Sequence, residues 1–301
     1  MVAAKLHADE VDVDHALVQQ LVSAQFPRWT ALPLSEVKSA GTDNYLYRLG
    51  NDMAVKLPRY SKAALQAEKE HIWLPLFAAK LPLAIPDPLA QGEPGLDYPF
   101  RWSVNRWIDG ENAIIAPPDN LQEAAKSLAG FIAALQAIDP AKGPLPGEHN
   151  FGRGVPLAER DERVRTSIQE LGSLIDAQTV MLEWEKSLHA PVWDRPPVWI
   201  HGDIHAGNLI VKEGKVRAVI DFGGLCVGDP ACEMILAWNM FDRNARATFR
   251  EALNVDDATW ARGRGWALSV SLIALPYYLH TNPVIVESSW RMIEKLLTEP
   301  D

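Results

Sequence analysis

The chain has 301 residues, enough for one large domain or two lobes with a well-buried core, and its two cysteines exclude a disulfide framework. Its 29 basic and 39 acidic residues give a formal net charge of −10, which argues against a nucleic-acid partner and is compatible with a cationic substrate. No apolar run approaches the roughly 18–20 residues of a membrane span, and the acidic start of the chain does not resemble a signal peptide, so we expect a cytoplasmic protein with no membrane partner.

The N-terminal part of the chain predicts one helix followed by several short strands. Asp12 or Asp14 can cap a helix that runs to about Phe26, with apolar residues on one side. Turn residues rich in Gly, Asn and Asp then separate three expected strands, at residues 36–39, 45–49 and 53–57.

A second helix and two more strands complete this strand-rich part. Residues 62–79 have helical character, although Pro75 should end or bend the helix. Strands are expected over residues 84–89 and 102–107. An Asp-Gly-Glu run then breaks the pattern and the composition becomes helical, so we expect two lobes, residues 1–109 and 110–301.

The second lobe is predicted to be mostly helical, with a few short strands in its middle. Asp119 can cap a helix, with Gln122 placed as in a capping box, and an apolar stripe follows at helical spacing. A further helix is expected between Glu159 and His189. Short apolar strands follow at residues 198–200, 209–211 and 216–220, and residues 231–297 are mostly helical.

Three oxygen-bearing side chains are expected at one end of the hairpin formed by the last two of these strands. Asn208 stands just before the first strand, and Asp221 follows the second. An antiparallel hairpin brings the start of its first strand beside the end of its second. Asn208 and Asp221 should therefore lie together, facing the loop that carries Asp203.

Phosphoryl transfer from a nucleotide requires this set of groups. Magnesium ions prefer oxygen ligands, and a carboxylate beside the acceptor hydroxyl can orient it and accept its proton. The kinase pattern has a catalytic Asp, an Asn five residues later, and an Asp-Phe-Gly whose Asp binds metal. Asp203 and Asn208 have this spacing, and Asp221 begins an Asp-Phe-Gly triplet.

Two runs, HGDIHAGN and VIDFGGLCVGDPACE, resemble the aminoglycoside phosphotransferase and choline kinase-like family, the small-molecule branch of the protein kinase-like fold. The resemblance implies an α+β, bilobal fold and a nucleotide co-substrate, ATP or GTP. It also implies that Asp203 is the catalytic base and that Asn208 and Asp221 hold Mg²⁺. His201, His205 and Asp229 are expected to brace the loops around them.

In the first lobe, the Met-Ala-Val-Lys-Leu strand resembles the kinase strand that carries the phosphate-binding lysine, Lys56. A lysine inside an apolar strand needs a partner for its ammonium group. Glu68 and Glu70 on the following helix both fit, and the family spacing favours Glu70. An exposed lysine at a sheet edge is the alternative.

Two further nucleotide contacts are implied by the resemblance. The turn containing Ser39 and Gly41 would cover the nucleotide, although its single glycine departs from the glycine-rich kinase loop, and a plain hairpin turn is the alternative. The segment at residues 102–109 corresponds to the hinge, so the backbone of Arg106 and Ile108 would bind the purine.

The acceptor is expected to be a small molecule, because Gly228-Asp229-Pro230 follows Asp221 closely and leaves no room for a peptide-binding platform. The resemblance favours an aminoglycoside-type, hydroxylated and possibly cationic acceptor. Candidate carboxylates for binding it are Asp161, Glu162, Asp229 and Glu233.

Other functions fit parts of the sequence. A metabolic kinase acting on an amino alcohol, amino acid or sugar would use the same groups. A metal-dependent phosphohydrolase would use His201, Asp203 and His205 as ligands, but it leaves Lys56 and the Asp-Phe-Gly triplet unexplained. A nucleotide-binding pseudokinase is disfavoured because the full set of expected catalytic groups is present.

Overall fold

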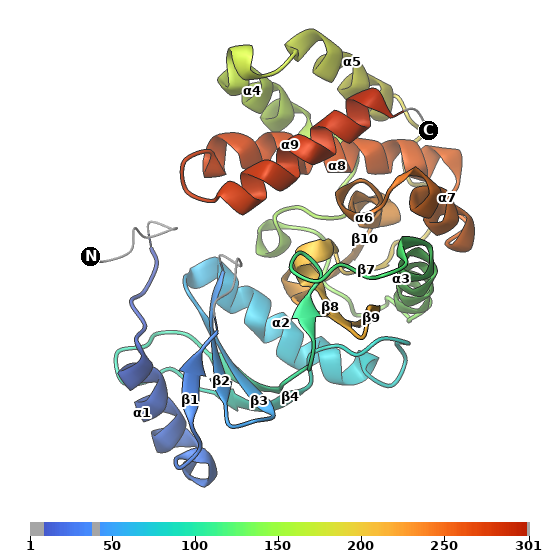
Figure 1. The fold of residues 1–301 in the computed structure, drawn as a ribbon. Coiled ribbons are helices and arrows are strands. Elements are labelled where there is room, and N and C mark those ends of the chain that lie inside the picture. Colours follow the sequence, from blue (N-terminus) through green and yellow to red (C-terminus); the bar gives the residue numbers. More distant parts are fainter. Residues whose placement is uncertain (1–8, 38–42, 300–301) are drawn as a thin grey trace.

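The computed structural model describes residues 9–37 and 43–299. An antiparallel sheet with its helices forms the N-terminal lobe, and a mostly helical lobe follows it (Figure 1). This arrangement confirms the expected α+β, kinase-like fold. The lobe boundary between residues 109 and 110 stays a prediction.

The sheet of the N-terminal lobe has the strand order β1-β2-β3-β5-β4, with antiparallel neighbours. Its strands are β1 (Leu34–Glu36), β2 (Asn44–Leu49), β3 (Met53–Pro58), β4 (Pro88–Gly92) and β5 (Trp102–Arg106). Lys56 therefore lies on the central strand, paired with Leu46 on one side and Ser103 on the other. The alternative of an edge lysine is wrong.

Helix α1 (His15–Gln25) packs against this sheet (Figure 1). It begins at Asp14, whose side chain accepts a hydrogen bond from the Leu17 N–H at 2.8 Å. Val18 and Leu21 are fully buried in the same apolar core as the strands. This burial accounts for the apolar side of the predicted helix.

Helix α2 (Ser61–Phe77) joins the two lobes. It continues through Pro75, so Pro75 does not end the helix: a proline in the last turn removes only a single helical hydrogen bond. Leu74 and Phe77 are buried in the core of the C-terminal lobe, where the Phe77 ring lies 4.9 Å from that of Trp199. The position of α2 thus depends on both lobes.

The C-terminal lobe surrounds a second apolar core. Its helices are α3 (Leu121–Gln136), α4 (Asp161–Leu171), α5 (Ala177–Leu188), α6 (Ile235–Met240), α7 (Arg243–Ala252), α8 (Asp257–Tyr278) and α9 (Pro283–Thr298). Its strands form two small sheets from β6 (Glu111–Asn112), β7 (Val198–Ile200), β8 (Leu209–Lys212), β9 (Lys215–Val219) and β10 (Cys226–Gly228).

Several predicted boundaries are wrong. Asn120, not Asp119, caps α3, because its side chain accepts the N–H groups of Gln122 and Glu123. The helix expected between residues 159 and 189 is two helices, since Gly172 ends α4 with a positive φ of 51°, which an L-residue rarely adopts. The first strand covers residues 34–36, and the strand expected at 84–89 begins only at Pro88.

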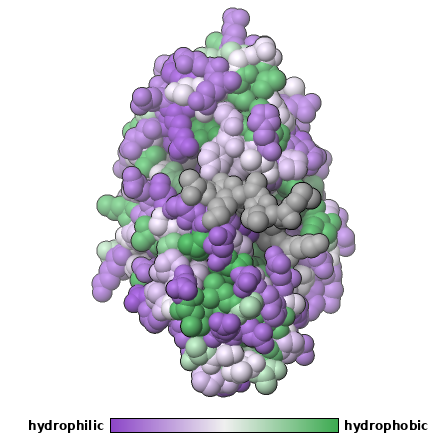
Figure 2. Space-filling model, turned by 90° about the vertical axis from the view of Figure 1, so that its left-hand side faces the viewer, coloured by the Kyte–Doolittle hydropathy of each residue, from purple (hydrophilic) through white to green (hydrophobic). Residues whose placement is uncertain are grey.

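No helix in the described part of the chain is long and apolar enough to cross a membrane. On the face shown in Figure 2, hydrophilic residues are interspersed with hydrophobic ones.

Candidate active site

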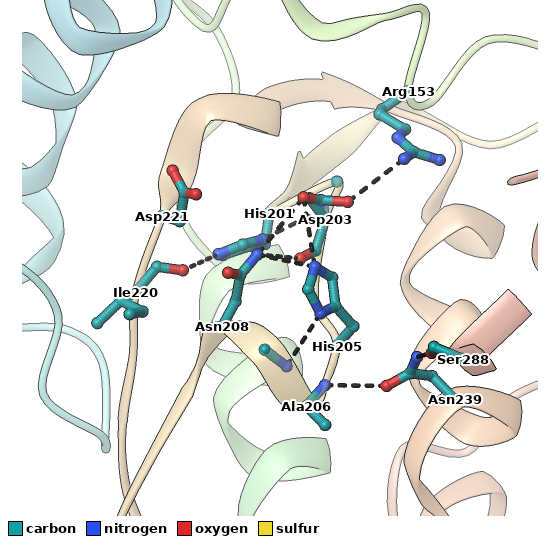
Figure 3. Close-up of polar contacts among 12 residues, drawn as sticks. Arg153, His201, Asp203, His205, Ala206, Asn208, Ile220, Asp221, Asn239 and Ser288 are labelled. Carbon is teal, nitrogen blue, oxygen red and sulfur yellow. Dashed lines mark hydrogen bonds and ion pairs between the residues drawn. The ribbon is translucent and has the colours of Figure 1, made fainter. Parts of the chain in front are cut away.

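Two strand pairs bring the predicted catalytic groups to one place. β7 pairs antiparallel with β10, and β8 pairs antiparallel with β9. The Ile220 N–H donates to the Asn208 carbonyl at 2.9 Å, so the start of β8 lies beside the residue before Asp221. Asp203 lies in the loop that connects β7 to β8, and all three side chains gather at this end of the hairpin (Figure 3).

The glycine before Asp203 is required by close backbone packing. Gly202 has φ +80°, a conformation that residues with a Cβ rarely adopt, and a Cβ there would lie 2.5 Å from the Gly224 carbonyl oxygen. The loop carrying Asp203 is therefore pressed directly against the segment that follows Asp221.

His201 supports the backbone of this loop. Its Nδ1 accepts the Asp203 N–H at 3.2 Å, so its Nε2 carries the proton that is donated to the Ile220 carbonyl at 3.1 Å. Burial lowers the pKa of His201 to about 4, which keeps the ring neutral near neutral pH. Both ring nitrogens are engaged by backbone groups, so His201 cannot bind a metal in this arrangement.

His205 and Arg153 flank the Asp203 carboxylate. His205 accepts the Gly207 N–H through Nδ1, and its Nε2 lies 3.6 Å from Asp203 Oδ2. Arg153 Nη2 lies 3.3 Å from Asp203 Oδ1. Burial alone would raise the pKa of Asp203, but the imidazole of His205 and the guanidinium of Arg153 outweigh burial and hold the pKa well below its usual range. With 40% of its side chain exposed, Asp203 is an ionised carboxylate that a hydroxyl can approach.

Asn208 and Asp221 offer oxygen atoms that fit a magnesium ion. Asn208 donates through Nδ2 to the Asp203 carbonyl at 2.9 Å, which leaves Oδ1 facing the side on which Asp221 lies (Figure 3). Asp221 has φ 64°, a strained conformation of the kind that concentrates at functional sites. No cluster of three or more His, Cys, Asp or Glu side chains suited to a metal occurs in residues 9–37 and 43–299. Two protein oxygens suit an ion whose other ligands are phosphate and water.

Lys56 lies between two carboxylates. Its Nζ lies 2.9 Å from both carboxylate oxygens of Glu70 and 3.2 Å from Asp221 Oδ1. Burial alone would lower the pKa of Lys56, but the charges of Asp221 and Glu70 outweigh burial and raise it. Glu68, the other candidate partner, lies 3.8 Å from Arg101 on the surface. The contact therefore involves Glu70, which also accepts the Phe222 N–H at 2.8 Å.

The remaining nucleotide-binding candidates are less fully described. Ser39 and Gly41 lie outside the described residues. The Arg106 N–H already donates to the Asp87 carbonyl at 2.8 Å, so a purine could use only the Arg106 carbonyl. The Ile108 N–H has no hydrogen-bond acceptor among the described residues, and this leaves it free to act as a donor.

Two acidic residues after the Asp-Phe-Gly triplet are structural. Asp229 caps the turn that begins at Pro230 and lies 2.8 Å from Arg262 in the interior. Glu233 accepts the Gly202 N–H at 2.7 Å and is fully buried, and this burial raises its pKa to about 7. Glu233 thus holds the loop that carries Asp203, a role that the sequence analysis did not assign to it.

Lys69 is a second supporting residue that the sequence analysis missed. Its buried Nζ donates to the Gly223 carbonyl at 2.7 Å and the Leu225 carbonyl at 3.2 Å, and it lies 2.8 Å from His149 Nδ1. Burial lowers the pKa of Lys69 to about 8. Lys69 therefore ties α2 to the segment after Asp221. A lysine on the inward side of α2, beside Glu70, was the only sequence signal.

The four carboxylates proposed to bind a cationic acceptor do not form a binding surface. Asp229 and Glu233 are buried and engaged, as described above. Asp161 accepts hydrogen bonds from Arg165 at 2.8 Å and from Trp184 at 2.7 Å, between α4 and α5. Only Glu162 is exposed without a side-chain contact in the described structure.

By their titles, solved structures with the same fold include aminoglycoside and macrolide phosphotransferases. APH(2″)-IIIa in complex with GDP and kanamycin has a TM-score of 0.74 at 18% identity, over 93% of this chain and 97% of that chain. APH(2″)-IIa with streptomycin and ATP has a TM-score of 0.61 at 18% identity, over 93% and 95%. Macrolide 2′-phosphotransferase MphH from Brachybacterium faecium has a TM-score of 0.60 at 18% identity, over 94% and 99%.

A search of curated protein sequences gave no match. The model of the phosphotransferase enzyme family, in contrast, matches residues 36–266, which include Lys56, Asp203, Asn208 and Asp221. The chain therefore belongs to the phosphotransferase enzyme family and is an O-phosphotransferase.

Proposed function

We propose that the protein transfers the γ-phosphoryl group of ATP or GTP to a hydroxyl of a small molecule. The observation that carries this proposal is the convergence of Asp203, Asn208 and Asp221 beside the buried contact of Lys56 with Glu70. These groups match the inventory of a phosphoryl-transfer site, where catalysis consists mainly of positioning and charge stabilisation.

Asp203 orients the acceptor hydroxyl in this proposal. Its exposed carboxylate accepts the hydroxyl hydrogen bond, the hydroxyl oxygen forms the new P–O bond, and the bond from the γ-phosphorus to the bridging oxygen breaks. The hydroxyl proton passes to Asp203. A carboxylate whose pKa is held low is a weak base, so it accepts the proton late in the formation of the P–O bond. Orienting the hydroxyl therefore contributes more to catalysis than accepting its proton.

On the nucleotide side, Lys56 would bind phosphate oxygens, and Asn208 and Asp221 would hold a Mg²⁺ ion that neutralises charge on the phosphates. The Arg106 carbonyl and the Ile108 N–H would bind the purine edge, and Ser39 and Gly41, outside the described residues, stay candidates for covering the phosphates. Glu70 and Lys69 keep α2 against the Asp-Phe-Gly segment so that Lys56 stays in place.

The acceptor class predicted from the sequence is an aminoglycoside-type compound. The names of the structural neighbours, which include kanamycin and streptomycin complexes, support that class, and a metabolic acceptor is the alternative. A phosphohydrolase with His201 as a metal ligand is disfavoured, because both ring nitrogens of His201 bind backbone groups.

The test is phosphate transfer to a panel of aminoglycosides, amino alcohols, hydroxy acids and sugars with ATP or GTP and Mg²⁺, detected as product mass. Asp203→Ala should lower kcat by on the order of 10²–10⁴ while nucleotide KM barely changes, because Asp203 contacts the acceptor. Asp194→Ala, at an exposed aspartate, serves as the control. Near wild-type turnover in Asp203→Ala would remove Asp203 from the reaction.

A further inference from the structure

The side of Asp203 that faces away from Asp221 is lined by a guanidinium group. Arg153 lies on that side (Figure 3), with Nη2 3.3 Å from Asp203 Oδ1. Its Nη1 is buried and, among the described residues, has no hydrogen-bond partner. Because a guanidinium group carries five N–H donors, the hydrogen-bonding capacity of Arg153 is only partly used.

Two more arginines lie close to Arg153. Arg160 donates to the Phe151 carbonyl at 3.1 Å and to Ser269 Oγ at 3.0 Å, both uncharged groups. Arg163 is exposed, one turn further along. Neither Arg160 nor Arg163 forms an ion pair within the described ranges.

The charges of these arginines reinforce one another. Burial, and then the charges of Arg153 and Arg163, lower the pKa of Arg160, so the Arg160 guanidinium lies within electrostatic reach of both. Asp161, the carboxylate next to Arg160 in the chain, is held by Arg165 and Trp184. Asp203 is the only carboxylate recorded within ion-pair distance of any of the three in the described structure.

We infer that the acceptor carries an anionic group, a carboxylate or a phosphate, that binds Arg153 when its hydroxyl bonds Asp203. This inference rests on the proposed function. A hydroxyl oxygen sits about 2.7 Å from a carboxylate oxygen in such a contact. Substituents a few bonds away then reach the guanidinium of Arg153, which matches carboxylate and phosphate groups in geometry as well as in charge. A polycation in the same position would meet like charges, so this inference disfavours the aminoglycoside-type acceptor predicted from the sequence and favours a metabolic acid instead.

The test compares the binding of matched acids and neutral compounds. Glycerate and glycerol form one pair, gluconate and glucose a second, and 3-phosphoglycerate and kanamycin complete the set. Binding is measured by calorimetry on the full chain with Mg²⁺ and a non-hydrolysable nucleotide. We expect at least one acid to bind about tenfold or more tightly than its neutral partner, because a charged hydrogen bond is about twice as strong as a neutral one. The carboxylate and phosphate arms show which anion is preferred.

Variants assign this preference to Arg153. Arg153→Met should weaken the binding of the acid more than that of its neutral partner and so remove this preference, and Arg153→Lys should retain part of it. Arg195→Met is the matched control, since Arg195 is an exposed arginine paired with Asp256. If Arg153 merely positioned Asp203, Arg153→Met would lower kcat for acids and neutral compounds alike.

A measurement on the wild-type protein tests the same inference without any variant. The Debye length falls from about 30 Å at 0.01 M salt to about 10 Å at 0.1 M, so acid binding should weaken over this range and neutral binding should not. Equal binding within every pair, or tighter binding of kanamycin than of every acid, would overturn the inference. If acids bound in an Arg153-dependent way but no compound were phosphorylated, the anion site would stand and the proposed phosphotransferase function would fail.

Discussion

The two sides of Asp203 differ in the charge that the protein presents. On the nucleotide side, Glu70 and Asp221 surround the single ammonium group of Lys56, and Asn208 adds a neutral oxygen. On the other side, Arg153 contacts Asp203, and Arg160 and Arg163 lie nearby without carboxylate partners in the described structure.

This difference agrees with what the proposed function requires each side to bind. An excess of oxygen ligands suits a triphosphate that arrives with a divalent cation, because the cation needs carboxylates. A set of guanidinium groups suits an anion that arrives alone. The net charge of −10 would suggest a cationic acceptor, whereas the local charge beside Asp203 is positive. Charges within a few ångströms of a ligand influence its binding more than the net charge of the whole protein does.

The largest effect is expected from removing the charge of Asp221. Asp221→Asn keeps the size of the side chain but weakens its hold on Mg²⁺ and removes one partner of Lys56. Turnover should fall by on the order of 10³ or more, with a smaller loss for Asn208→Ala. The measurement is kcat as a function of Mg²⁺ concentration. Unchanged Mg²⁺ dependence in both variants would show that the metal is held elsewhere.

A somewhat smaller effect is expected from Lys56→Met, which keeps the apolar stem and removes the charge that binds phosphate. The kcat/KM for nucleotide should fall on the order of 10²-fold, while acceptor affinity is retained. The variant should stay folded by circular dichroism but be less stable, because Glu70 loses its partner inside the protein. Lys62→Met, at an exposed lysine at the start of α2, is the control. Equal nucleotide kinetics in the two variants would contradict the role of Lys56.

A more moderate effect is expected from Lys69→Met, which releases α2 from the carbonyl groups of Gly223 and Leu225. Leaving buried acceptors unpaired costs about 1–3 kcal/mol of unfolding free energy. Because Glu70 on α2 holds Lys56 in place, the kcat/KM for nucleotide should fall about tenfold, equivalent to about 1.4 kcal/mol. Acceptor KM should stay constant. A matching loss of acceptor affinity would mean that Lys69 supports both sides of Asp203.

The smallest effect on turnover is expected from Glu233→Gln, a substitution beneath the loop shared by both sides whose main effect is on stability. The pKa of Glu233 is raised from 4.5 to about 7 by burial, so the folded protein keeps a proton that the unfolded chain has lost. This contribution to stability is full at pH 4.5 and below, and it falls as pH rises to about 7, by up to about 1.4 kcal/mol per pH unit.

The free energy of unfolding of Glu233→Gln, relative to wild type, should therefore increase between pH 4.5 and pH 7. Urea unfolding at several pH values measures this difference. Glu162→Gln, at an exposed glutamate, is the control and should show no such trend. If the difference in unfolding free energy between Glu233→Gln and wild type did not change with pH, the Glu233 carboxyl of the wild type would be less buried than the structure shows.

Much of the nucleotide side was predictable because its residues are close in sequence or lie on regular elements. Asn208 and Asp221 flank one hairpin, and antiparallel pairing brings such positions together. Lys56 was recognisable as a lysine in an apolar strand, and the family spacing selected Glu70. The cap of α3 was misplaced by one residue, because Asp119 and Asn120 are both good caps and only the backbone conformation distinguishes them.

Pairings between distant segments were not predictable. Ala84, expected in a strand of the first sheet, instead bridges to Ala218 of β9 in the other lobe, and no local propensity distinguishes these partners. Lys69 and Arg153 have no distinguishing sequence pattern, because a lysine on a helix and an arginine in a loop are usually exposed.

The sequence by itself determined the chemistry of this protein. The spacing of Asp203, Asn208 and Asp221, with Lys56 upstream, predicts a phosphoryl-transfer site, because few residue types can hold magnesium, phosphate and a hydroxyl together. Only the tertiary structure decided the charge beside Asp203, since Arg153 lies 50 residues away along the chain. Whether a charged side chain is buried, paired or free depends on which distant segments pack against it, and that packing sets the electrostatic field at the acceptor.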